Sequence, residues 1–389
     1  MSRELSSYSL TLNQTPTAYF GIGSVQQVGE LAKSLGATKA MIVTDSFIAG
    51  SEIRQKIESS VISAGLEVVV FEGVMPNPTT SCVDEGSDFA AECKADLLIA
   101  VGGGSSMDTA KGISLGAVNP ERGLGLDYTT QFSRPGLPII AIPTTAGTGS
   151  EVNAFGVITD EVSHVRFYVG HSSALAKCAI LDPSLTLGLP PKATAATGMD
   201  ALVHAIESYL SKRSNPYSDG IALQGVSMVS RHLETAFEQG SNLEARSQML
   251  LASHVIGVGF SHTGLGLVHG IGHSLGGHFN IPHGVALCLV LEEVLRFNLP
   301  HVGDRMAQIA GALGVANTNH TVAENSEVAI VEIARITRSV GLGGRLSDHG
   351  ISVDDLEMLA STAVQDAVTL NNPVEPSQEQ VVEILRRAL

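Results

Sequence analysis

Hydrophobic and polar residues alternate with two different periods along this chain of 389 residues. In the first half, short runs of β-branched and other apolar residues are separated by stretches in which apolar residues recur every three or four positions. This alternation is typical of βαβ units and predicts a parallel sheet covered by helices. The runs that predict strands are AMIVT (40–44), EVVVFEG (67–73), DLLIAVGGG (96–104) and PIIAIPTT (138–145).

The second half has the helical period almost throughout. Residues 192–211 and 242–261 are two long examples, and few runs there resemble strands. The change falls near DPSLTLGLPP (182–191), whose three prolines are typical of a linker. The length also favours two domains. We therefore predict an α/β dinucleotide-binding domain over residues 1–188 and an all-α domain over residues 189–389, with a metal and a cofactor in the cleft between them.

Composition narrows the class of protein. Hydrophobic residues make up 44% of the chain and charged residues 16%, as in a folded enzyme. The formal charge of −16 argues against nucleic acid and against an anionic membrane surface as partners. No run of about 18 apolar residues and no leader pattern is present, so we expect a cytoplasmic protein. The four cysteines lack C-x-x-C spacing, which indicates reduced thiols and no thiolate zinc site.

A glycine-rich turn follows the strand expected at residues 97–101. Gly102, Gly103 and Gly104 let the backbone approach a ligand closely, and we expect Ser105 to open a helix whose N-terminal amides bind a pyrophosphate. Asp108 lies three residues after Ser105. That spacing suits a helix cap and also a direct contact with the cofactor, and the sequence leaves both open.

Two further features point to the same cofactor. Asp45 ends the strand expected at 40–44, where a carboxylate can bind the adenosine ribose and disfavour NADP, although it can also be an ordinary turn aspartate. A second loop, IPTTAGTGSE (142–151), follows another strand and offers hydroxyl and amide donors. The loop at 19–31, with Gly21 and Gly23, competes for the phosphate, and we rank it lower because its strand is short.

Histidines crowd the second half in a pattern that suits a metal. Asp200 and His204 are four residues apart, which places both on one helical face, and His269 and His273 share that spacing. Each histidine alone is better explained as a hydrogen-bonded core residue, but one carboxylate with several imidazoles on apolar helices indicates ligands. Asp200, His204, His269 and His283 can surround Fe(II), Zn(II) or a similar divalent ion. His273 would border the site and handle protons.

These residues belong to segments that resemble a known family. Residues 179–207 and 266–286 look like the two signature regions of iron-dependent (group III) alcohol dehydrogenases, and GGGSSMDTAKG (102–112) and PTTAGTGSEV (143–152) resemble the family's cofactor loops. The likeness covers nearly the whole chain, and within the family it is greatest to the lactaldehyde reductase (1,2-propanediol oxidoreductase) branch.

The resemblance implies an NAD-dependent and metal-dependent enzyme that transfers hydride reversibly between a small primary alcohol or diol and the nicotinamide. It implies Fe(II) as the metal, with Zn(II) as an alternative, and a homodimer or higher homo-oligomer. The implied ligands are Asp200, His204, His269 and His283, with His273 near the nicotinamide. The implied cofactor residues are Asp45, Gly102, Gly103, Gly104, Ser105, Asp108, Thr144, Thr145 and Thr148.

The chain departs from the family pattern at three positions. Arg166 stands where relatives usually have a lysine, which keeps the charge but not the compact ammonium group. Cys288 stands where asparagine is common, and Val374 where a basic residue often follows a proline. None of the three is a proposed ligand, so the departures bear on the substrate and on details of cofactor binding.

The sequence alone leaves other functions open. A lyase or cyclase of the dehydroquinate synthase type resembles this fold and also uses NAD with a metal. A non-catalytic protein that senses NAD or metal would keep the same ligands for binding alone. A hydrolytic metalloenzyme would leave the phosphate loops unexplained.

Overall fold

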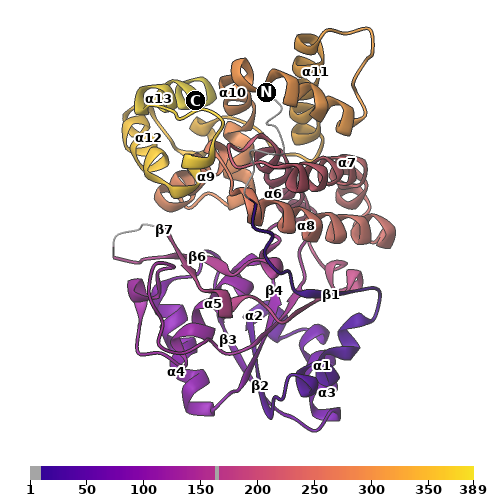
Figure 1. The fold of residues 1–389 in the computed structure, drawn as a ribbon, viewed down its shortest axis with the longest axis vertical. Helices are drawn as coiled ribbons and strands as arrows, with labels where there is room; N and C mark the ends of the chain where they lie inside the picture. The colour runs from indigo at the N-terminus through magenta and orange to yellow at the C-terminus, as the bar shows by residue number, and fades with distance from the viewer. Residues whose placement is uncertain (1–9, 163–165) are drawn as a thin grey trace.

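The computed structural model describes residues 10–162 and 166–389, and it divides into an α/β part and a helical part (Figure 1). Every strand of the described chain lies before residue 182, and only helices follow Pro191. The strands are β1 (Thr17–Phe20), β2 (Lys39–Asp45), β3 (Glu67–Val74), β4 (Leu97–Gly102), β5 (Ile139–Pro143), β6 (Phe155–Thr159), β7 (Arg166–Gly170) and β8 (Cys178–Leu181).

Six strands form one parallel sheet in the order β1-β8-β5-β4-β2-β3, which confirms the predicted parallel sheet. Alternate residues of each strand enter two separate cores. Ala40 and Ile42 pack with one pair of helices, and Met41 and Val43 pack with the other pair. Both faces are therefore covered, which explains the continuous apolar runs of the sequence. The helices of this part are α1 (Val28–Ser34), α2 (Ser46–Ala49), α3 (Glu52–Ser63), α4 (Thr80–Cys93) and α5 (Gly104–Gly116).

The strand order reverses between β2 and β4. After β2 the chain crosses to β3 on one side, and after β4 it crosses to β5 on the other side. Connections that leave neighbouring strands in opposite directions open a crevice at the carboxyl ends of those strands, where nucleotides bind in this class of fold. Asp45 ends β2 and Gly102 ends β4, so both lie at this switch point.

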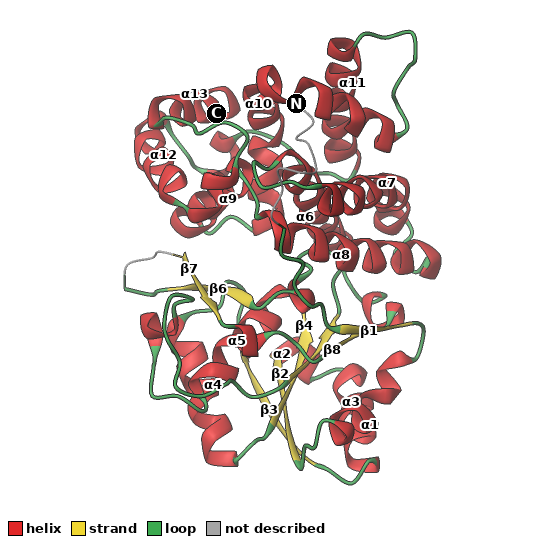
Figure 2. Ribbon diagram, in the orientation of Figure 1, coloured by secondary structure: helices red, strands yellow, loops and turns green. Residues whose placement is uncertain are grey.

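An antiparallel hairpin, β6–β7, accompanies the main sheet and was not predicted. It packs against α5 and forms a separate small core with residues such as Leu115, Ile158 and Val169. Figure 2 shows it beside the helical part of the molecule. The hairpin therefore extends the α/β part toward the helices.

The helical part has one continuous apolar core. Helix α6 is buried along most of its length because it packs against α7, α8 and α10 (Figure 2). None of the described helices is by itself long and apolar enough to cross a membrane, and the pair α8–α9 meets those criteria only when its two halves, bent by 103°, are taken together. The helices are α6 (Pro191–Leu210), α7 (Pro216–Glu238), α8 (Leu243–Thr263), α9 (Leu267–Phe279), α10 (His283–Leu313), α11 (Val322–Ser339), α12 (Leu356–Gln365) and α13 (Gln378–Ala388).

Candidate metal and cofactor site

The glycine-rich turn joins β4 to the N-terminus of α5. Helix α5 begins at Gly104 with Gly103 as its N-cap, one residue earlier than the predicted start at Ser105. No side chain of the described residues caps this helix, so its first amides stay available to a ligand. Gly102 has φ +141°, and a Cβ there would lie 2.3 Å from Ser106 Oγ. Only glycine fits this tight approach.

Asp108 does not cap helix α5, so that interpretation is wrong. It lies inside the helix, beyond the first turn that a cap reaches. Its Oδ1 accepts a hydrogen bond from Ser150 Oγ at 2.6 Å, and its Oδ2 accepts one from the Val157 amide at 3.0 Å. Asp108 thus joins α5 to the second loop and to strand β6.

The second predicted loop packs directly on the first. The Thr144 amide donates to the Gly102 carbonyl at 2.9 Å. A Cβ at Gly103 would lie 3.3 Å from Thr145 Cγ2, and one at Gly104 would lie 2.6 Å from Thr148 Cγ2. The small residues of the first loop therefore make room for the threonines of the second.

Asp45 and the competing glycine loop lie at different places on the sheet. Asp45 Oδ1 accepts from the Ile48 amide at 2.9 Å and caps α2, while its Oδ2 would lie 3.8 Å from a Cβ at Gly102. Asp45 is therefore a turn residue that also faces the phosphate loop. Gly21 and Gly23 follow edge strand β1, away from the switch point between β2 and β4.

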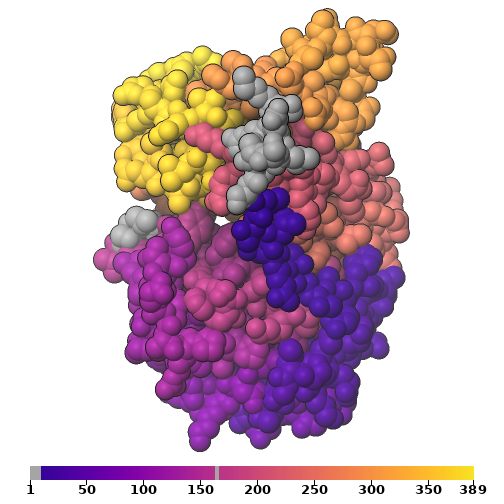
Figure 3. Space-filling view, viewed as in Figure 1, coloured from indigo at the N-terminus to yellow at the C-terminus, as the bar shows by residue number. Residues whose placement is uncertain are grey.

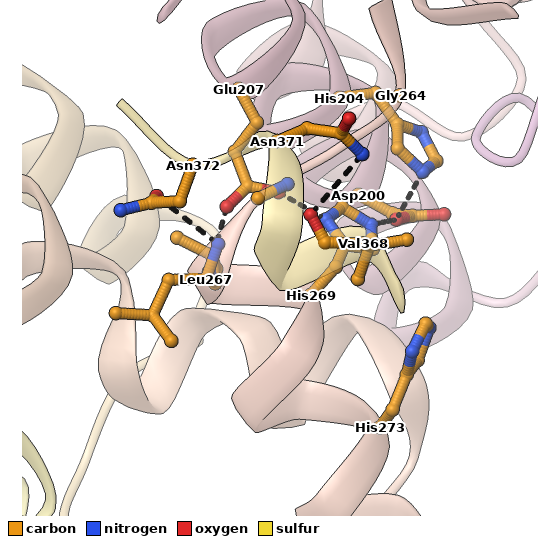
Figure 4. A network of polar contacts seen from close by, with 12 residues as sticks. Asp200, His204, Glu207, Gly264, Leu267, His269, His273, Val368, Asn371 and Asn372 are labelled. Atoms are coloured by element: carbon orange, nitrogen blue, oxygen red, sulfur yellow. Dashed lines mark hydrogen bonds and ion pairs between the residues drawn. The ribbon is translucent and has the colours of Figure 1, made fainter. Parts of the chain in front are cut away.

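Three histidines surround Asp200 in the helical part. Asp200 Oδ1 lies 3.4 Å from His204 Nε2, 3.5 Å from His269 Nε2 and 3.6 Å from His283 Nε2. Helix α6 supplies Asp200 and His204, α9 supplies His269, and His283 is the first residue of α10. The four predicted ligands therefore converge on one point, as Figure 4 shows for the first three.

The donor atoms of this cluster fit a divalent ion. Among the described residues, Asp200 Oδ1 and His269 Nε2 are buried without a hydrogen-bond partner, and Asp200, His269 and His283 each offer a ligand atom within 4.8 Å of the others. Two donors bound at about 2.0–2.2 Å to one ion lie at most about 4.4 Å apart, and the 3.4–3.6 Å spacings meet that limit. An unpaired buried carboxylate is otherwise unfavourable.

Charge and burial set the protonation of the cluster. Burial alone would raise the pKa of the Asp200 carboxyl, but the neighbouring imidazoles hold it well below its usual range. Burial lowers the pKa of His204 to about 4 and lowers the pKa of His283 well below its usual value. Asp200 is therefore a carboxylate, and these two imidazoles are neutral, which are the forms that bind metal.

His204 differs from the other ligands in its surroundings. Its Nδ1 lies 3.3 Å from the Gly147 carbonyl, which leaves Nε2 facing Asp200. Its ring stacks between Phe260 and His269, with both centroids at 4.6 Å. It lies outside the group of three whose ligand atoms are mutually within 4.8 Å, so its role as a fourth ligand stays a prediction.

Glu207 orients His269 and was not predicted. Its Oε2 lies 2.6 Å from His269 Nδ1, and its two oxygens also accept from the amides of Gly266 and Val268, the residues around the start of α9 (Figure 4). Burial opposes protonation of His269, but Asp200 and Glu207 together raise its pKa to about 9. Glu207 thus keeps a proton on Nδ1 and turns Nε2 toward Asp200, and the second proton that the raised pKa retains on Nε2 would be released when a metal binds there. It follows His204 by three residues on the same helical face, a signal that the sequence already carried.

His273 has a carboxylate partner of its own. Its Nδ1 lies 2.7 Å from Asp366 Oδ2, and Tyr168 Oη donates to Asp366 Oδ1 at 3.1 Å. Burial raises the pKa of Asp366, but His273 outweighs that effect and lowers it. The ring of His273 stacks on that of His283 with centroids 5.5 Å apart. No periodicity links Asp366 to α9, so sequence reasoning had no signal for it.

One pocket of about 240 Å³ is lined by residues of the α/β part and by the Asp–His cluster of the helical part. Figure 3 shows the surface indented where the two parts meet. The predicted residues that line the pocket are Gly104, Ser105, Asp108, Thr148, Asp200, His204, His269, His273 and His283. The other predicted cofactor residues do not line the pocket and lie at the adjoining strand ends: Gly102, Gly103, Thr144, Thr145 and Asp45. The N-terminus of α5 and the Asp–His cluster thus share one cavity.

A doubly wound dinucleotide-binding sheet joined to a helical metal centre defines a class of metal-dependent, nicotinamide-linked dehydrogenases. Two family models match the chain: "Iron-containing alcohol dehydrogenase" over residues 15–183 and "Fe-containing alcohol dehydrogenase family, C-terminal" over residues 194–389. The chain belongs to the iron-containing alcohol dehydrogenase family. The predicted resemblance, fold class and enzyme class are confirmed.

Individual relatives agree over nearly the full length. The chain is 37% identical to the NAD-dependent methanol dehydrogenase of Bacillus methanolicus, over 96% of this chain and 98% of that protein. It is 36% identical to the lactaldehyde reductase of Escherichia coli (strain K12), over 97% and 99% respectively. A crystal structure of 1,3-propanediol oxidoreductase superposes with a TM-score of 0.95 at 35% identity, covering 98% of this chain and all of that one. These names denote different alcohols.

Proposed function

We propose that this protein catalyses reversible hydride transfer between a small primary alcohol or diol and NAD, with a divalent metal, Fe(II) first and Zn(II) as the alternative. The observation that carries the proposal is the cluster of ligand atoms on Asp200, His269 and His283, which faces the same pocket as the N-terminus of α5. Among the described residues, its Asp200 Oδ1 and His269 Nε2 are buried without a hydrogen-bond partner. The names of the relatives, which denote methanol, lactaldehyde and 1,3-propanediol activities, support this substrate range.

The metal would be held by Asp200, His204, His269 and His283. The pyrophosphate would be bound by the amides at Gly103, Gly104 and Ser105. When bound, the metal supplies Lewis-acid polarisation of the alcohol oxygen and NAD⁺ supplies the hydride acceptor. The threonines at 144, 145 and 148 would contact the nucleotide, and Asp45 and Asp108 would face it from the switch point and from α5. The Asp45 carboxylate favours NAD over NADP because it repels a 2′-phosphate.

The chain's own proton path would begin at His273. This imidazole lies in the pocket next to the ring of His283, and Asp366 fixes its Nδ1, so Nε2 can take the hydroxyl proton of the alcohol. The Asp366 carboxylate stabilises the imidazolium that forms. Tyr168 holds that carboxylate in place by donating to its other oxygen.

The pocket gives little support to the alternatives. Arg166 is the one lysine or arginine among the described residues that line it, whereas a lyase of the dehydroquinate synthase type needs several cations for a polyanionic substrate. A protein that only senses NAD or metal would bind both without turnover. We also propose a homodimer or higher homo-oligomer, a cytoplasmic location, no nucleic-acid or membrane partner and a domain boundary at 188/189.

The test follows NADH absorbance after the metal-stripped protein receives Fe(II) or Zn(II) without oxygen. The alcohol panel contains 1,2-propanediol, 1,3-propanediol, ethanol, butanol and 4-hydroxybutyrate. We expect NADH production that requires the metal and is lost in His269→Ala. Tight NAD binding with no turnover on any alcohol, with either metal, would overturn the proposal in favour of the sensor or the lyase.

A further inference from the structure

Arg166 places a cation in the pocket that the proposed chemistry does not use. It begins β7, is half-buried and lines the same cavity as His269, His273 and His283. Neither metal binding by Asp200 and the histidines nor proton transfer by His273 requires a guanidinium. A buried cation is unfavourable unless a ligand or a partner compensates it.

No carboxylate of the described residues forms an ion pair with Arg166. Among the described residues, the one hydrogen bond of its guanidinium runs from Nη2 to Asn77 Oδ1 at 2.9 Å. Asp366 acts on Arg166 only through longer-range charge, and its two oxygens already accept from Tyr168, the Val368 amide and His273. A guanidinium has five N–H donors, so most of its capacity remains for something in the pocket.

The fold holds this guanidinium at a fixed position on α9. A Cβ at Gly276 would lie 2.7 Å from Arg166 Nη2, so the glycine gives the guanidinium its place against the helix. Gly276 follows His273 by three residues and His269 by seven, on one helical face. Asn77 is held in turn by its amide, which donates to Asn280 Oδ1 at 3.2 Å. Gly276 itself lies about 10 Å along the helix axis from His269, at about 1.5 Å per residue, and the guanidinium packs against the helix at that point.

We propose that Arg166 is a specificity-determining residue, and that the enzyme's substrates include short ω-hydroxy acids whose carboxylate binds the guanidinium while the hydroxyl end lies at the metal cluster. This inference rests on the proposed function. In the reaction, the alcohol carbon loses hydride to NAD⁺ and the hydroxyl loses its proton to His273 and then to solvent. The products are an ω-oxo acid, NADH and H⁺.

Planar guanidinium and carboxylate groups form paired, charge-assisted hydrogen bonds, which a neutral hydroxyl cannot match. The negative net charge of the whole chain does not oppose this site, because a local cation dominates within a pocket. Arg166 therefore favours an acid over the diol of the same length.

The experiment compares kcat/KM for 4-hydroxybutyrate and 1,4-butanediol, and for the three-carbon and five-carbon pairs, with the Zn(II)-loaded enzyme and NAD⁺. We expect Arg166→Gln to lower the acid-to-diol ratio by about 30-fold or more, because a buried charge pair loses one partner. Arg166→Lys should lower it less. Gly276→Ala, which keeps the charge but displaces the guanidinium, should also lower it. Arg386→Gln, an exposed arginine paired with Glu383, is the matched control and should change nothing.

An unchanged ratio in Arg166→Gln would overturn the inference while leaving the proposed function intact. An equal rise in the KM for NAD⁺ with both substrates would overturn it as well, because Arg166 would then serve the cofactor. If the wild type turns over no alcohol, calorimetric titration of 4-hydroxybutyrate into the protein with Zn(II) and NADH separates the two proposals. Weaker binding to Arg166→Gln supports the subsite, and equal binding overturns it.

Discussion

Glu207 determines which nitrogen of His269 faces Asp200 and the other candidate metal ligands. A carboxylate behind a ligating imidazole fixes its tautomer and raises its basicity, and loss of such a partner lowers metal affinity about 10- to 100-fold. We expect this loss in Glu207→Gln, measured by competition with a chelator for Zn(II). Glu238→Gln, an exposed position on α7, is the control. Equal affinity in both variants would show that Glu207 only packs the start of α9.

A second prediction at the level of single residues concerns His273. Removal of a general acid–base group lowers the rate about 10²- to 10⁴-fold, and we expect kcat of His273→Ala to fall within that range. Added imidazole should restore part of the rate, and Asp366→Asn should alter the pH profile through the same pair. An unchanged rate and pH profile in His273→Ala would remove the proton path.

The candidate metal ligands could be selected from the sequence because their residue types and their spacing both suit a metal site. Asp200 and His204 share a helical face, and so do His269 and His273, so the sequence placed these residues before the fold was known. Glu207 follows the same periodicity and could have been found by extending it. Asp366 comes from a distant turn, and its contact with His273 exists only because the chain returns to α9.

At the scale of elements, Lys111 ties the phosphate-binding helix to the second loop. Its Nζ donates to Ser150 Oγ at 2.6 Å, to Asn153 Oδ1 at 2.8 Å and to the Phe155 carbonyl at 2.6 Å. Burial lowers its pKa from 10.5 to about 8, and the negative charges of Asp108 and Glu151 oppose that shift only in part.

The shifted pKa predicts a pH-dependent stability. Between pH 8 and 10.5 the unfolded chain keeps a proton on Lys111 that the folded chain has released. The penalty of burying this charge is therefore fully present below pH 8 and disappears as pH rises toward 10.5. We expect the free energy of unfolding of the wild type, minus that of Lys111→Met, to rise by about 3 kcal/mol over this interval.

Urea unfolding at several pH values measures this difference, with Lys56→Met at an exposed position as the control. A difference between wild type and Lys111→Met that stays flat from pH 8 to 10.5 would contradict the prediction. The same variant should raise the KM for NAD⁺, because Ser150, Asn153 and the Phe155 carbonyl would lose their donor.

The local sequence pattern predicted the strands of the main sheet but not the hairpin. The strands β2, β4 and β5 were predicted because they are buried on both faces and form apolar runs in the sequence. The edge strand β3 is only partly buried, but its valines gave the same signal. The hairpin β6–β7 was missed because it lies outside the main sheet and its pattern was not separated from the loops around it. The spacing of Asp108 left a helix cap and a cofactor contact both open, whereas its contacts with Ser150 and with Val157 of the hairpin were not predicted.

At the scale of the whole molecule, the metal should stabilise the fold. A ligand that binds only the folded state adds about 2.7 kcal/mol when its free concentration is 100 times its Kd. We expect Zn(II) to raise the melting temperature of the metal-stripped protein in calorimetry, because it compensates the unpaired donors of Asp200, His269 and His283. Asp200→Asn should abolish most of this rise. An equal rise in that variant would indicate that zinc binds elsewhere.

The hairpin β6–β7 belongs to the α/β part but supplies much of the wall that a substrate would meet, including Phe155, Val157, Arg166 and Tyr168. It is neither a strand of the nucleotide-binding sheet nor a source of metal ligands. Its bonds to Asp108 and Lys111 use the backbone of Val157 and Phe155, so side-chain changes in the hairpin can alter the preferred alcohol while those bonds and the candidate ligands are kept. A lineage that needs a new substrate can vary this short segment and inherit the rest of the catalyst unchanged.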